Sequence, residues 1–441
     1  MLRPEEILQK LIRFNTVNPP GNEAECIEYL KSIFDEAGLE TKVLAKVPGR
    51  PNLFARLAGT GEKPPILFYG HVDTVPVSGQ DWSVDPFEGL IKDGFLWGRG
   101  ALDMKGLLSM FISAILRLKE ESSAKPTASV SEAVLPFDVL LLCLCDEENK
   151  GDFGAKYICE EHAGLLTGVK YAIGELGGFS MYVGGKKFYP VMVSEKQCAH
   201  LRVTFRGKGG HGSTVHRNSA AAKLGRALVR LDEKRLPLHV SEEARIMIKA
   251  IAASIGPGGL VLRQTLNPLF SGKILDLIGT DGEYFDAILH NTVNATIIKN
   301  QNDSINVIPE EVSVELDTRL VPRLKIEDVI RELRTLFGDD CLIEVVNYDP
   351  GPVTVDYTMF DTFAGVLKKC DPGAIPIPYI MSGVTDGRFF AGLNIQTYGF
   401  TPMNLPEDFA LTELIHGADE RIPLDALHFG ADAVYELLMS L

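Results

Sequence analysis

The sequence lacks long hydrophobic runs, basic blocks and internal repeats. No apolar stretch approaches the roughly 20 residues that a helix needs to cross a bilayer, so we expect no membrane span. Lys and Arg together number 44 and Asp and Glu number 59, which gives a formal net charge of −15. An acidic chain without a basic block is poorly suited to bind nucleic acid or an anionic membrane surface. We therefore expect no nucleic-acid partner and no membrane partner.

Cysteine is scarce and irregularly spaced. The seven cysteines form an odd, scattered set, which provides no disulfide framework. Cys143 and Cys145 fall inside an apolar stretch, where thiols serve as small hydrophobic side chains. The amphipathic N-terminal segment MLRPEEILQKLIRF contains acidic residues, unlike a signal or transit peptide. These features predict a cytoplasmic protein.

The length of the chain and the changing pattern of helices and strands along it predict two domains, one inserted in the other. The 441 residues, of which 45% are hydrophobic, exceed a single typical core. Residues 1–193 and 351–441 alternate between helical and strand patterns, which predicts an α/β domain with a mixed sheet flanked by helices. Residues 194–350 follow the order β-α-β-β-α-β of a ferredoxin-like α+β unit. This order is interrupted by an extra insertion, 234–289, with helical and Gly/Pro-rich parts.

Apolar periodicity and turn residues predict the individual elements. A glycine-rich turn from Gly98 leads into an apolar helix with Asp103 at its start, and residues 121–136 are expected to form a surface loop. The other predicted helices are 4–14, 23–37, 219–231, 325–337, 359–369 and 424–441. The predicted strands are 41–47, 52–58, 66–69, 139–145, 171–174, 200–206, 291–299, 310–319, 341–347 and 394–400.

Imidazole and carboxylate groups follow three of these strands. His71 and Asp73 come after strand 66–69, Glu147 and Glu148 after strand 139–145, and Glu175 after strand 171–174. Open α/β sheets place their sites at the carboxyl ends of strands. Imidazoles and carboxylates without thiolates are the ligands of hard or borderline divalent ions. The pattern favours a metal site at this edge of the sheet.

Each of these groups also has a simpler explanation. A histidine after a strand is often only hydrogen-bonded, and adjacent carboxylates such as Glu147 and Glu148 can form a solvated acidic turn. Two neighbouring carboxylates repel each other, however, unless one binds a metal and the other accepts a proton. The glycine loop around His211 could cradle phosphate, but the Lys-Ser/Thr of a P-loop does not accompany it.

Six short signatures occur in order along nearly the whole chain: GHVDTVP, GRGALDMKG, CDEENKG, GELGG, RGKGGHGS and LIHGADERI. Together they resemble the zinc-dependent aminoacylase and carboxypeptidase family, which includes acetylornithine deacetylase, succinyl-diaminopimelate desuccinylase and glutamate carboxypeptidase. The stretch WSVDPFEGLIKDGFLWGRGALDMKG is most similar to the branch of carboxypeptidase S and N-acyl-amino-acid hydrolases. The resemblance implies that the α/β domain is catalytic and that the inserted domain serves as a lid or dimerisation domain.

The resemblance implies a centre of two divalent ions, with zinc expected and cobalt or manganese as alternatives. Asp103 is expected to bridge the ions and to precede a cis peptide bond. The expected metal ligands are His71 and Glu175 for one ion, Glu148 and His416 for the other, and Asp103 for both. His428 is the alternative to His416, but it lies on an amphipathic helix, where a packing role fits better.

The resemblance also implies catalytic and substrate-binding roles. Glu147 is expected to act as the general base, and Asp73 to orient His71. His211 is expected to stabilise the oxyanion of the tetrahedral intermediate, from the partner subunit of a dimer. The expected substrate-binding residues are Asn306, Arg319, Ser382, Gly383, Thr385 and Arg388. Arg388 could clamp a carboxylate bidentately, whereas Arg319 could equally pair with a surface acid.

The sequence thus predicts a dinuclear metal-dependent amidohydrolase that cleaves an amide bond of an N-acyl amino acid or short peptide. It would use metal-activated water and Glu147, and would form a homodimer through the inserted domain. One alternative is a dipeptidase or carboxypeptidase acting on short peptides. Another is a metal-binding scaffold without catalysis, against which the retained Glu147 argues, since a non-catalytic site needs no second carboxylate.

Overall fold

The structure is a computed structural model that describes residues 2–123, 135–300, 302, 304–352 and 354–441. The chain divides into two compact units. The first unit comprises Met1–Val193, Val355–Tyr379 and Thr385–Leu441, and the second comprises Ser194–Thr354 and Ile380–Val384. The predicted division lay at residues 193/194 and 350/351, without the short return of the chain to the second unit.

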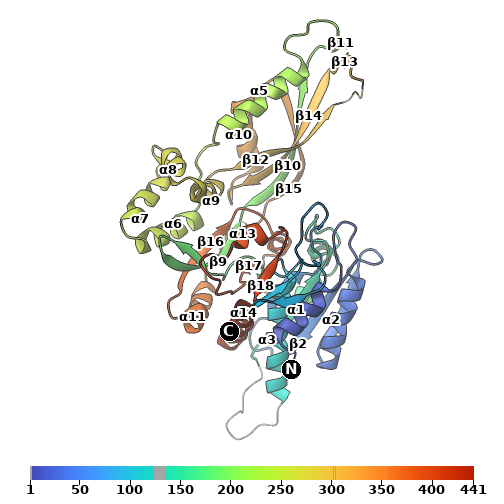
Figure 1. The fold of residues 1–441 in the computed structure, drawn as a ribbon, viewed down its shortest axis with the longest axis vertical. Coiled ribbons are helices and arrows are strands. Elements are labelled where there is room, and N and C mark those ends of the chain that lie inside the picture. The colour runs from blue at the N-terminus through green and yellow to red at the C-terminus, as the bar shows by residue number, and fades with distance from the viewer. Residues whose placement is uncertain (1, 124–134, 301, 303, 353) are drawn as a thin grey trace. The chain divides into compact units, whose positions relative to one another are not determined.

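A nine-stranded mixed sheet forms the centre of the first unit (Figure 1). Its order is β1-β2-β6-β3-β7-β17-β9-β16, with β8 paired to β9. Neighbours among β6, β3, β7 and β17 run parallel, whereas β1, β2 and β9 make antiparallel pairs. The strands are β1 (Glu40–Ala45), β2 (Pro51–Leu57), β3 (Ile66–His71), β6 (Val139–Leu144), β7 (Tyr171–Gly174), β8 (Met181–Val183), β9 (Lys186–Glu195), β16 (Ile375–Met381) and β17 (Gln396–Gly399).

Helices cover both faces of this sheet because its central strands are apolar throughout. Every residue of β3 and β6 is buried, as expected for parallel strands enclosed on two sides. Phe68 belongs to the core that includes residues of α1 (Pro4–Ile12), α2 (Ala24–Glu36), α3 (Lys105–Ser123), α11 (Phe360–Cys370) and α14 (Leu424–Ser440). Its neighbour Tyr69 belongs to the core with α4 (Ala155–Glu161) and α12 (Gly387–Ala391).

The first unit also contains a small three-stranded sheet with the order β18-β5-β4, and its strands adjoin segments that carry site residues. It consists of β4 (Leu90–Lys92), β5 (Phe95–Trp97) and β18 (Arg421–Pro423). The segment between β5 and α3 carries Asp103, and the segment before β18 carries His416. Pairing of β18 with β5 therefore links these two distant parts of the sequence.

The second unit contains a four-stranded antiparallel sheet with the order β12-β14-β10-β15 (Figure 1). Its strands are β10 (Gln197–Arg206), β12 (Thr292–Asn300), β14 (Glu311–Leu320) and β15 (Cys341–Asp349). Apolar residues of α5 (Ala220–Glu233) and α10 (Ile326–Phe337) pack on one face of the sheet. The insertion is helical, with α6 (Glu242–Ser254), α7 (Pro257–Leu262), α8 (Ser271–Ile278) and α9 (Thr280–Leu289).

The predicted fold class is confirmed: a mixed sheet flanked by helices, interrupted by a unit with ferredoxin-like order. The expected cis bond between Asp103 and Met104 is present. The predicted loop 121–136 was wrong at its start, because α3 continues to Ser123, and residues 124–134 lie outside the described part. The sequence analysis also missed β9, β16 and the small sheet. Among the described residues, we find no helix with the length and hydrophobicity of a membrane span.

Candidate metal centre

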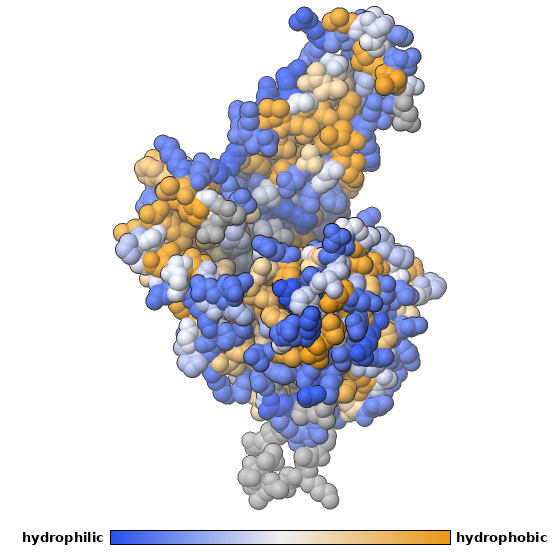
Figure 2. Space-filling view, in the orientation of Figure 1, coloured by the Kyte–Doolittle hydropathy of each residue, from blue (hydrophilic) through white to orange (hydrophobic). Residues whose placement is uncertain are grey.

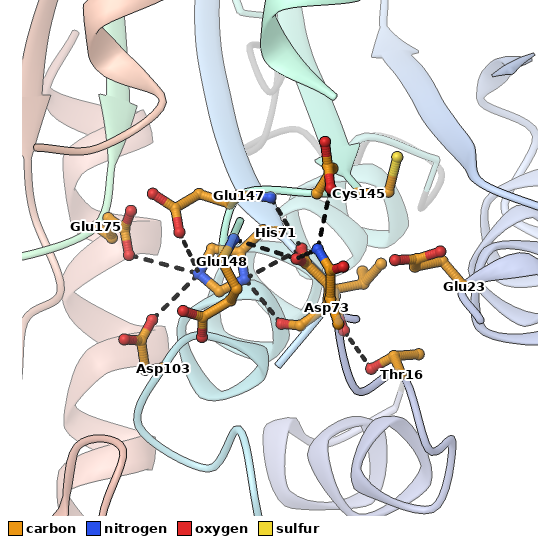
Figure 3. Close-up of polar contacts among 12 residues, drawn as sticks. Thr16, Glu23, His71, Asp73, Asp103, Cys145, Glu147, Glu148 and Glu175 are labelled. Carbon is orange, nitrogen blue, oxygen red and sulfur yellow. Dashed lines mark hydrogen bonds and ion pairs between the residues drawn. The ribbon is translucent and has the colours of Figure 1, made fainter. Parts of the chain in front are cut away.

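The carboxyl ends of β6, β3 and β7 lie side by side and carry three of the five predicted metal ligands, together with Glu147 and Asp73. His71 is the last residue of β3, Glu175 follows β7 directly, and Glu147 and Glu148 follow β6 after two residues. These three strands are parallel neighbours, so their carboxyl ends meet at one edge. Figure 3 shows these side chains converging on the His71 imidazole.

The first group of candidate ligands is His71, Asp103 and Glu175. Their ligand atoms lie within 4.8 Å of one another. His71 Nε2 is 3.1 Å from Asp103 Oδ1 and 3.7 Å from Glu175 Oε2. All three side chains are at least partly withdrawn from solvent, and His71 is buried. One imidazole and two carboxylates in this arrangement fit a divalent ion of the zinc, cobalt or manganese type.

The second group is Asp103, Glu148 and His416, again with ligand atoms within 4.8 Å of one another. His416 Nε2 is 3.1 Å from Asp103 Oδ2 and 3.3 Å from Glu148 Oε2. Glu148 Oε1 is buried and has no hydrogen-bond partner among the described residues, a costly state that a cation would relieve. Asp103 presents a different oxygen to each group, so the donor sets fit two ions that share this carboxylate.

His428, the alternative to His416, lies elsewhere. Its Nε2 is 2.8 Å from Glu5 Oε2, and it belongs to none of the ligand groups found among the described residues. The structure thus brings His71, Asp103, Glu148, Glu175 and His416 together. It leaves His428 in a hydrogen bond between α14 and the buried Glu5 of α1.

In the absence of metal, hydrogen bonds from histidines and protonation of carboxyl groups offset the repulsion among the clustered acids. Burial alone would raise the pKa of Asp103, but hydrogen bonds from His416 and His71 hold that pKa well below its usual range. Hydrogen bonds to Asp103 and Glu148 raise the pKa of His416 to about 10. Burial raises the pKa of Glu175 to about 7. Because metal ligands must be deprotonated, ion binding is expected to displace these protons.

Glu147 contacts the centre without joining either ligand group. Its Oε2 lies 3.9 Å from His71 Nε2. Burial, followed by repulsion from Glu175, raises the pKa of Glu147 well above its ordinary value. A carboxylate with a raised pKa beside a metal centre is suited to accept and return a proton near neutral pH.

Asp73 holds the loop that carries the two glutamates. Its Oδ1 and Oδ2 accept hydrogen bonds from the backbone N–H groups of Glu147 and Glu148, both at 3.2 Å. The His71 Nδ1–H instead donates to the backbone carbonyl of Asp73 at 2.9 Å, while the nearer carboxylate oxygen is 3.6 Å away. The carbonyl fixes the His71 tautomer, and the carboxylate positions Glu147 and Glu148.

Glu420 is a site residue that the sequence analysis did not assign. This fully buried carboxylate accepts hydrogen bonds from the N–H groups of Gly100, Leu102 and Asp103 at 2.9, 2.7 and 3.1 Å. It also forms a buried ion pair with Arg99 at 2.7 Å. Glu420 therefore fixes the turn that presents Asp103. Its position four residues after His416, in the same signature, was the available signal.

Glu420→Gln is expected to weaken binding of divalent metal about 10–100-fold, the usual cost of losing a group that orients metal ligands. The amide cannot accept from Arg99 and from all three backbone donors at once, so Asp103 loses its fixed orientation. Zinc affinity measured by competition with a chelating indicator checks this prediction. The control is Glu413→Gln, which changes an exposed carboxylate on the neighbouring helix α13 (Leu411–Leu414). Equal affinities in the two variants would contradict the assigned role.

The predicted residues of the inserted unit form two separate groups. His211 and Asn306 are neighbours, because β11 (Gly210–His211) pairs with β13 (Val307–Ile308) and the Gly212 N–H donates to the Asn306 carbonyl at 2.8 Å. The exposed His211 ring contacts Ser213 Oγ at 2.8 Å. Arg319 lies on β14 and forms a bidentate pair with Asp317, at 2.8 and 3.0 Å.

The predicted SGVTDGR loop is divided between the two units. Ser382 and Gly383 belong to the second unit and Thr385 and Arg388 to the first. Thr385 is buried and accepts from the Gly387 N–H at 2.9 Å. Arg388 donates to the Thr385 and Lys150 carbonyls at 2.8 and 3.3 Å.

Asp386, in the same loop, was missed by the sequence analysis. It is buried, and neither carboxylate oxygen has a partner among the described residues. Burial raises its pKa to about 7, and its charge in turn raises the pKa of Glu147. Its place between Thr385 and Arg388 in SGVTDGR was the signal that could have identified it.

Residues 67–440 match the sequence profile of Peptidase family M20/M25/M40. The chain belongs to this family. The match covers all five candidate metal ligands, and the chain is a metal-dependent hydrolase of C–N amide bonds. The predicted family and enzyme class are therefore confirmed.

Two similar relatives extend over almost the entire chain. The N-fatty-acyl-amino acid synthase/hydrolase PM20D1 of Bos taurus is 26% identical over 460 residues, covering 99% of this chain and 87% of its own length. Aminoacylase-1 of Sus scrofa is 25% identical over 446 residues, covering 99% and 94%. The name of the first relative describes a synthase and hydrolase of N-fatty-acyl amino acids, and that of the second describes an aminoacylase.

Two solved structures share the fold of this M20 chain. An M20 family metallo-carboxypeptidase from Sulfolobus solfataricus has a TM-score of 0.69 at 19% identity and covers 99% of both chains. The YXEP protein of Bacillus subtilis, described as a dinuclear metal-binding peptidase, has a TM-score of 0.59 at 14% identity, covering 99% and 96%. At these identities the likeness establishes the fold alone. The two ligand groups are inferred from the distances between side chains of this chain.

Proposed function

We propose that this M20 hydrolase cleaves the amide bond of an N-acyl amino acid with a centre of two zinc ions. The observation that carries the proposal is Asp103, which offers one oxygen to each of two ligand groups, while Glu147 stays outside both. Support for the substrate class comes from relatives named as acting on acyl amino acids and similar to this chain along its length. Cobalt or manganese would fit the same oxygen and nitrogen donors.

The chain's own residues have distinct tasks in this reaction. His71 and Glu175 would hold one ion, Glu148 and His416 the other, and Asp103 both. When bound, the ions polarise the amide carbonyl and lower the pKa of a water molecule. Glu147 accepts the proton of the attacking water and delivers it to the nitrogen of the leaving amino acid. The Asp73 carboxylate accepts hydrogen bonds from the backbone N–H groups of Glu147 and Glu148 and so holds both residues in position.

The substrate carboxylate is proposed to bind to arginine. The Arg319 guanidinium is held in a fixed orientation by Asp317, which reduces the entropic cost of clamping a ligand. Arg388 is held in turn by two backbone carbonyls. Asn306, Ser382, Gly383 and Thr385 complete the proposed substrate-binding set; the Thr385 hydroxyl also stabilises its own loop.

We further propose that the enzyme is a cytoplasmic homodimer paired through the inserted unit. Figure 2 shows hydrophobic residues gathered on the surface of this unit. Exposed apolar side chains include Ile297, Ile298, Val345 and Val346, on the two outermost strands of its sheet. Such surfaces are typical of association. The seven cysteine thiols, none in a disulfide, are compatible with a reducing compartment.

The test of the metal centre compares ligand variants by the metal they retain. Glu175→Ala and Glu148→Ala are each expected to hold about one ion fewer per chain than the parent enzyme, and Asp103→Ala about two fewer. His416→Ala should lose metal as Glu148→Ala does, while the matched control His428→Ala should not. Metal content is measured by elemental analysis after equilibration with zinc. Full metal content in Asp103→Ala would overturn the dinuclear proposal.

The substrate class is tested separately. Protein stripped by chelation should be inactive, and zinc should restore hydrolysis of N-acyl amino acids with free α-carboxylates. The same panel includes dipeptides and C-terminally blocked acyl amino acids. Higher kcat/KM for dipeptides than for every acyl amino acid would replace the deacylase proposal with the peptidase alternative and leave the metal assignment unchanged.

A further inference from the structure

A third group of metal-binding side chains lies in the inserted unit: Cys198, His200 and Asp317. Their Sγ, imidazole nitrogen and carboxylate oxygen lie within 4.8 Å of one another. Cys198 is 8% exposed, Asp317 is half-buried and His200 is exposed. All three belong to the second unit, and none of them is a candidate ligand of the dinuclear centre.

The strand register explains why these side chains converge. Cys198 and His200 are two residues apart on β10, so they point to the same face of the sheet. Asp317 on β14 is the direct partner of His200, and side chains of directly opposed residues are close neighbours. The intervening Ala199 and the next residue, Leu201, face the apolar core with α5 and α10. The cluster therefore occupies the opposite, polar face.

The second face of β10 and β14 is polar along its length. Next to the cluster, Arg319 opposes Cys198 and holds the Asp317 carboxylate, and Arg202 pairs with Glu315 at 2.9 Å. The two bonds from Arg319 use one acceptor position on each oxygen of Asp317. A carboxylate has about four such positions, so Asp317 can bind a cation while it holds Arg319.

We infer that Cys198, His200 and Asp317 form a mononuclear site for a late first-row divalent ion such as zinc. Thiolate, imidazole and carboxylate are all zinc ligands, and three protein ligands leave the fourth tetrahedral position for water. The thiolate selects against Mg²⁺, Ca²⁺ and Mn²⁺, which prefer oxygen donors. The bound ion would join β10 to β14 and fix the carboxylate that orients Arg319.

The thiolate gives this site a spectroscopic signal that does not depend on catalysis. Enzyme stripped of metal under reducing conditions is titrated with Co²⁺ alone, and the near-ultraviolet sulfur-to-cobalt charge-transfer band is recorded. The dinuclear centre contains no cysteine among its candidate ligands, so cobalt bound there cannot produce the band. We expect a band with the amplitude of one thiolate–cobalt bond per chain. Its absence would overturn this site and leave the dinuclear proposal untouched.

Two ligand variants and one control test the site. Cys198→Ser should abolish the band. His200→Ala should raise the cobalt concentration needed for half-saturation at least about 10-fold, because losing a ligand costs no less than losing an orienting group. Cys341→Ser is the matched control on β15 and should keep the band, because the Cys341 thiol donates to the Gly338 carbonyl and belongs to none of the ligand groups found in the described part of the chain. A band that survives Cys198→Ser, or one unaffected by His200→Ala, would overturn the three-ligand site.

Discussion

Glu147→Gln is expected to reduce kcat at least about 100-fold, the lower end of what general acid–base catalysis provides. The substitution keeps the size of the side chain but replaces its carboxylate with an amide, which cannot act as a base. The backbone N–H of residue 147 still donates to Asp73, so the loop and Glu148 stay in place. Metal content and KM should therefore change little. Burial already raises the pKa of Glu147, which makes its carboxylate a stronger base.

Two further variants separate chemistry from structure. Glu147→Asp retains a carboxylate but withdraws it by one methylene, so its kcat should fall between those of Glu147→Gln and the parent enzyme. Glu161→Gln changes an exposed carboxylate on α4 and should have no effect. A Glu147→Gln variant with parental kcat would remove Glu147 from the mechanism. A variant with low activity and reduced metal would instead assign it to the ligand set.

Hydrophobic pattern was sufficient to predict the interior of the fold. β3 and β6 are buried at every residue, and polar groups occur within two residues of the end of each apolar run. The sequence therefore predicted both the strands and the edge of the sheet that carries the site. The order β-α-β-β-α-β likewise predicted the ferredoxin-like sheet. In contrast, β9 (KKFYPVMVSE) contains a proline and polar residues at both ends. These residues obscured the pattern of a strand that pairs with the neighbouring β8 and with the distant β17.

Metal ligands are easier to predict than the groups that position them. His71, Glu148 and Glu175 follow strands, where their chemistry stands out from the apolar background. Glu420 and Asp386 act through backbone amides or a local field, and these depend on segments more than 200 residues apart. Their places in LIHGADERI and SGVTDGR indicated that both lie near the site, but these signatures do not reveal the contacts that define their roles. For the same reason the sequence indicated that Asp73 belonged to the site but not which of its atoms performed which task.

His211→Ala is expected to reduce kcat about 100–1000-fold, the usual effect of removing one oxyanion donor. His211 is exposed and belongs to the unit that contains none of the five candidate ligands of the dinuclear centre, so metal content should be unchanged. His216→Ala, in the same loop, is the control and should keep most of the activity. Parental kcat in His211→Ala would exclude it from catalysis.

Mixing variants decides whether His211 acts on its own subunit or on the partner. In a dimer of His211→Ala with Glu147→Gln chains, a shared arrangement gives one site with both groups intact. Equal amounts that re-pair at random place about half of the chains in mixed dimers, so about a quarter of parental activity should return. If each site uses its own His211, both sites of the mixed dimer lack one group, and the mixture stays as inactive as its components. That outcome would exclude the proposed action in trans while leaving the metal centre and Glu147 in their assigned roles.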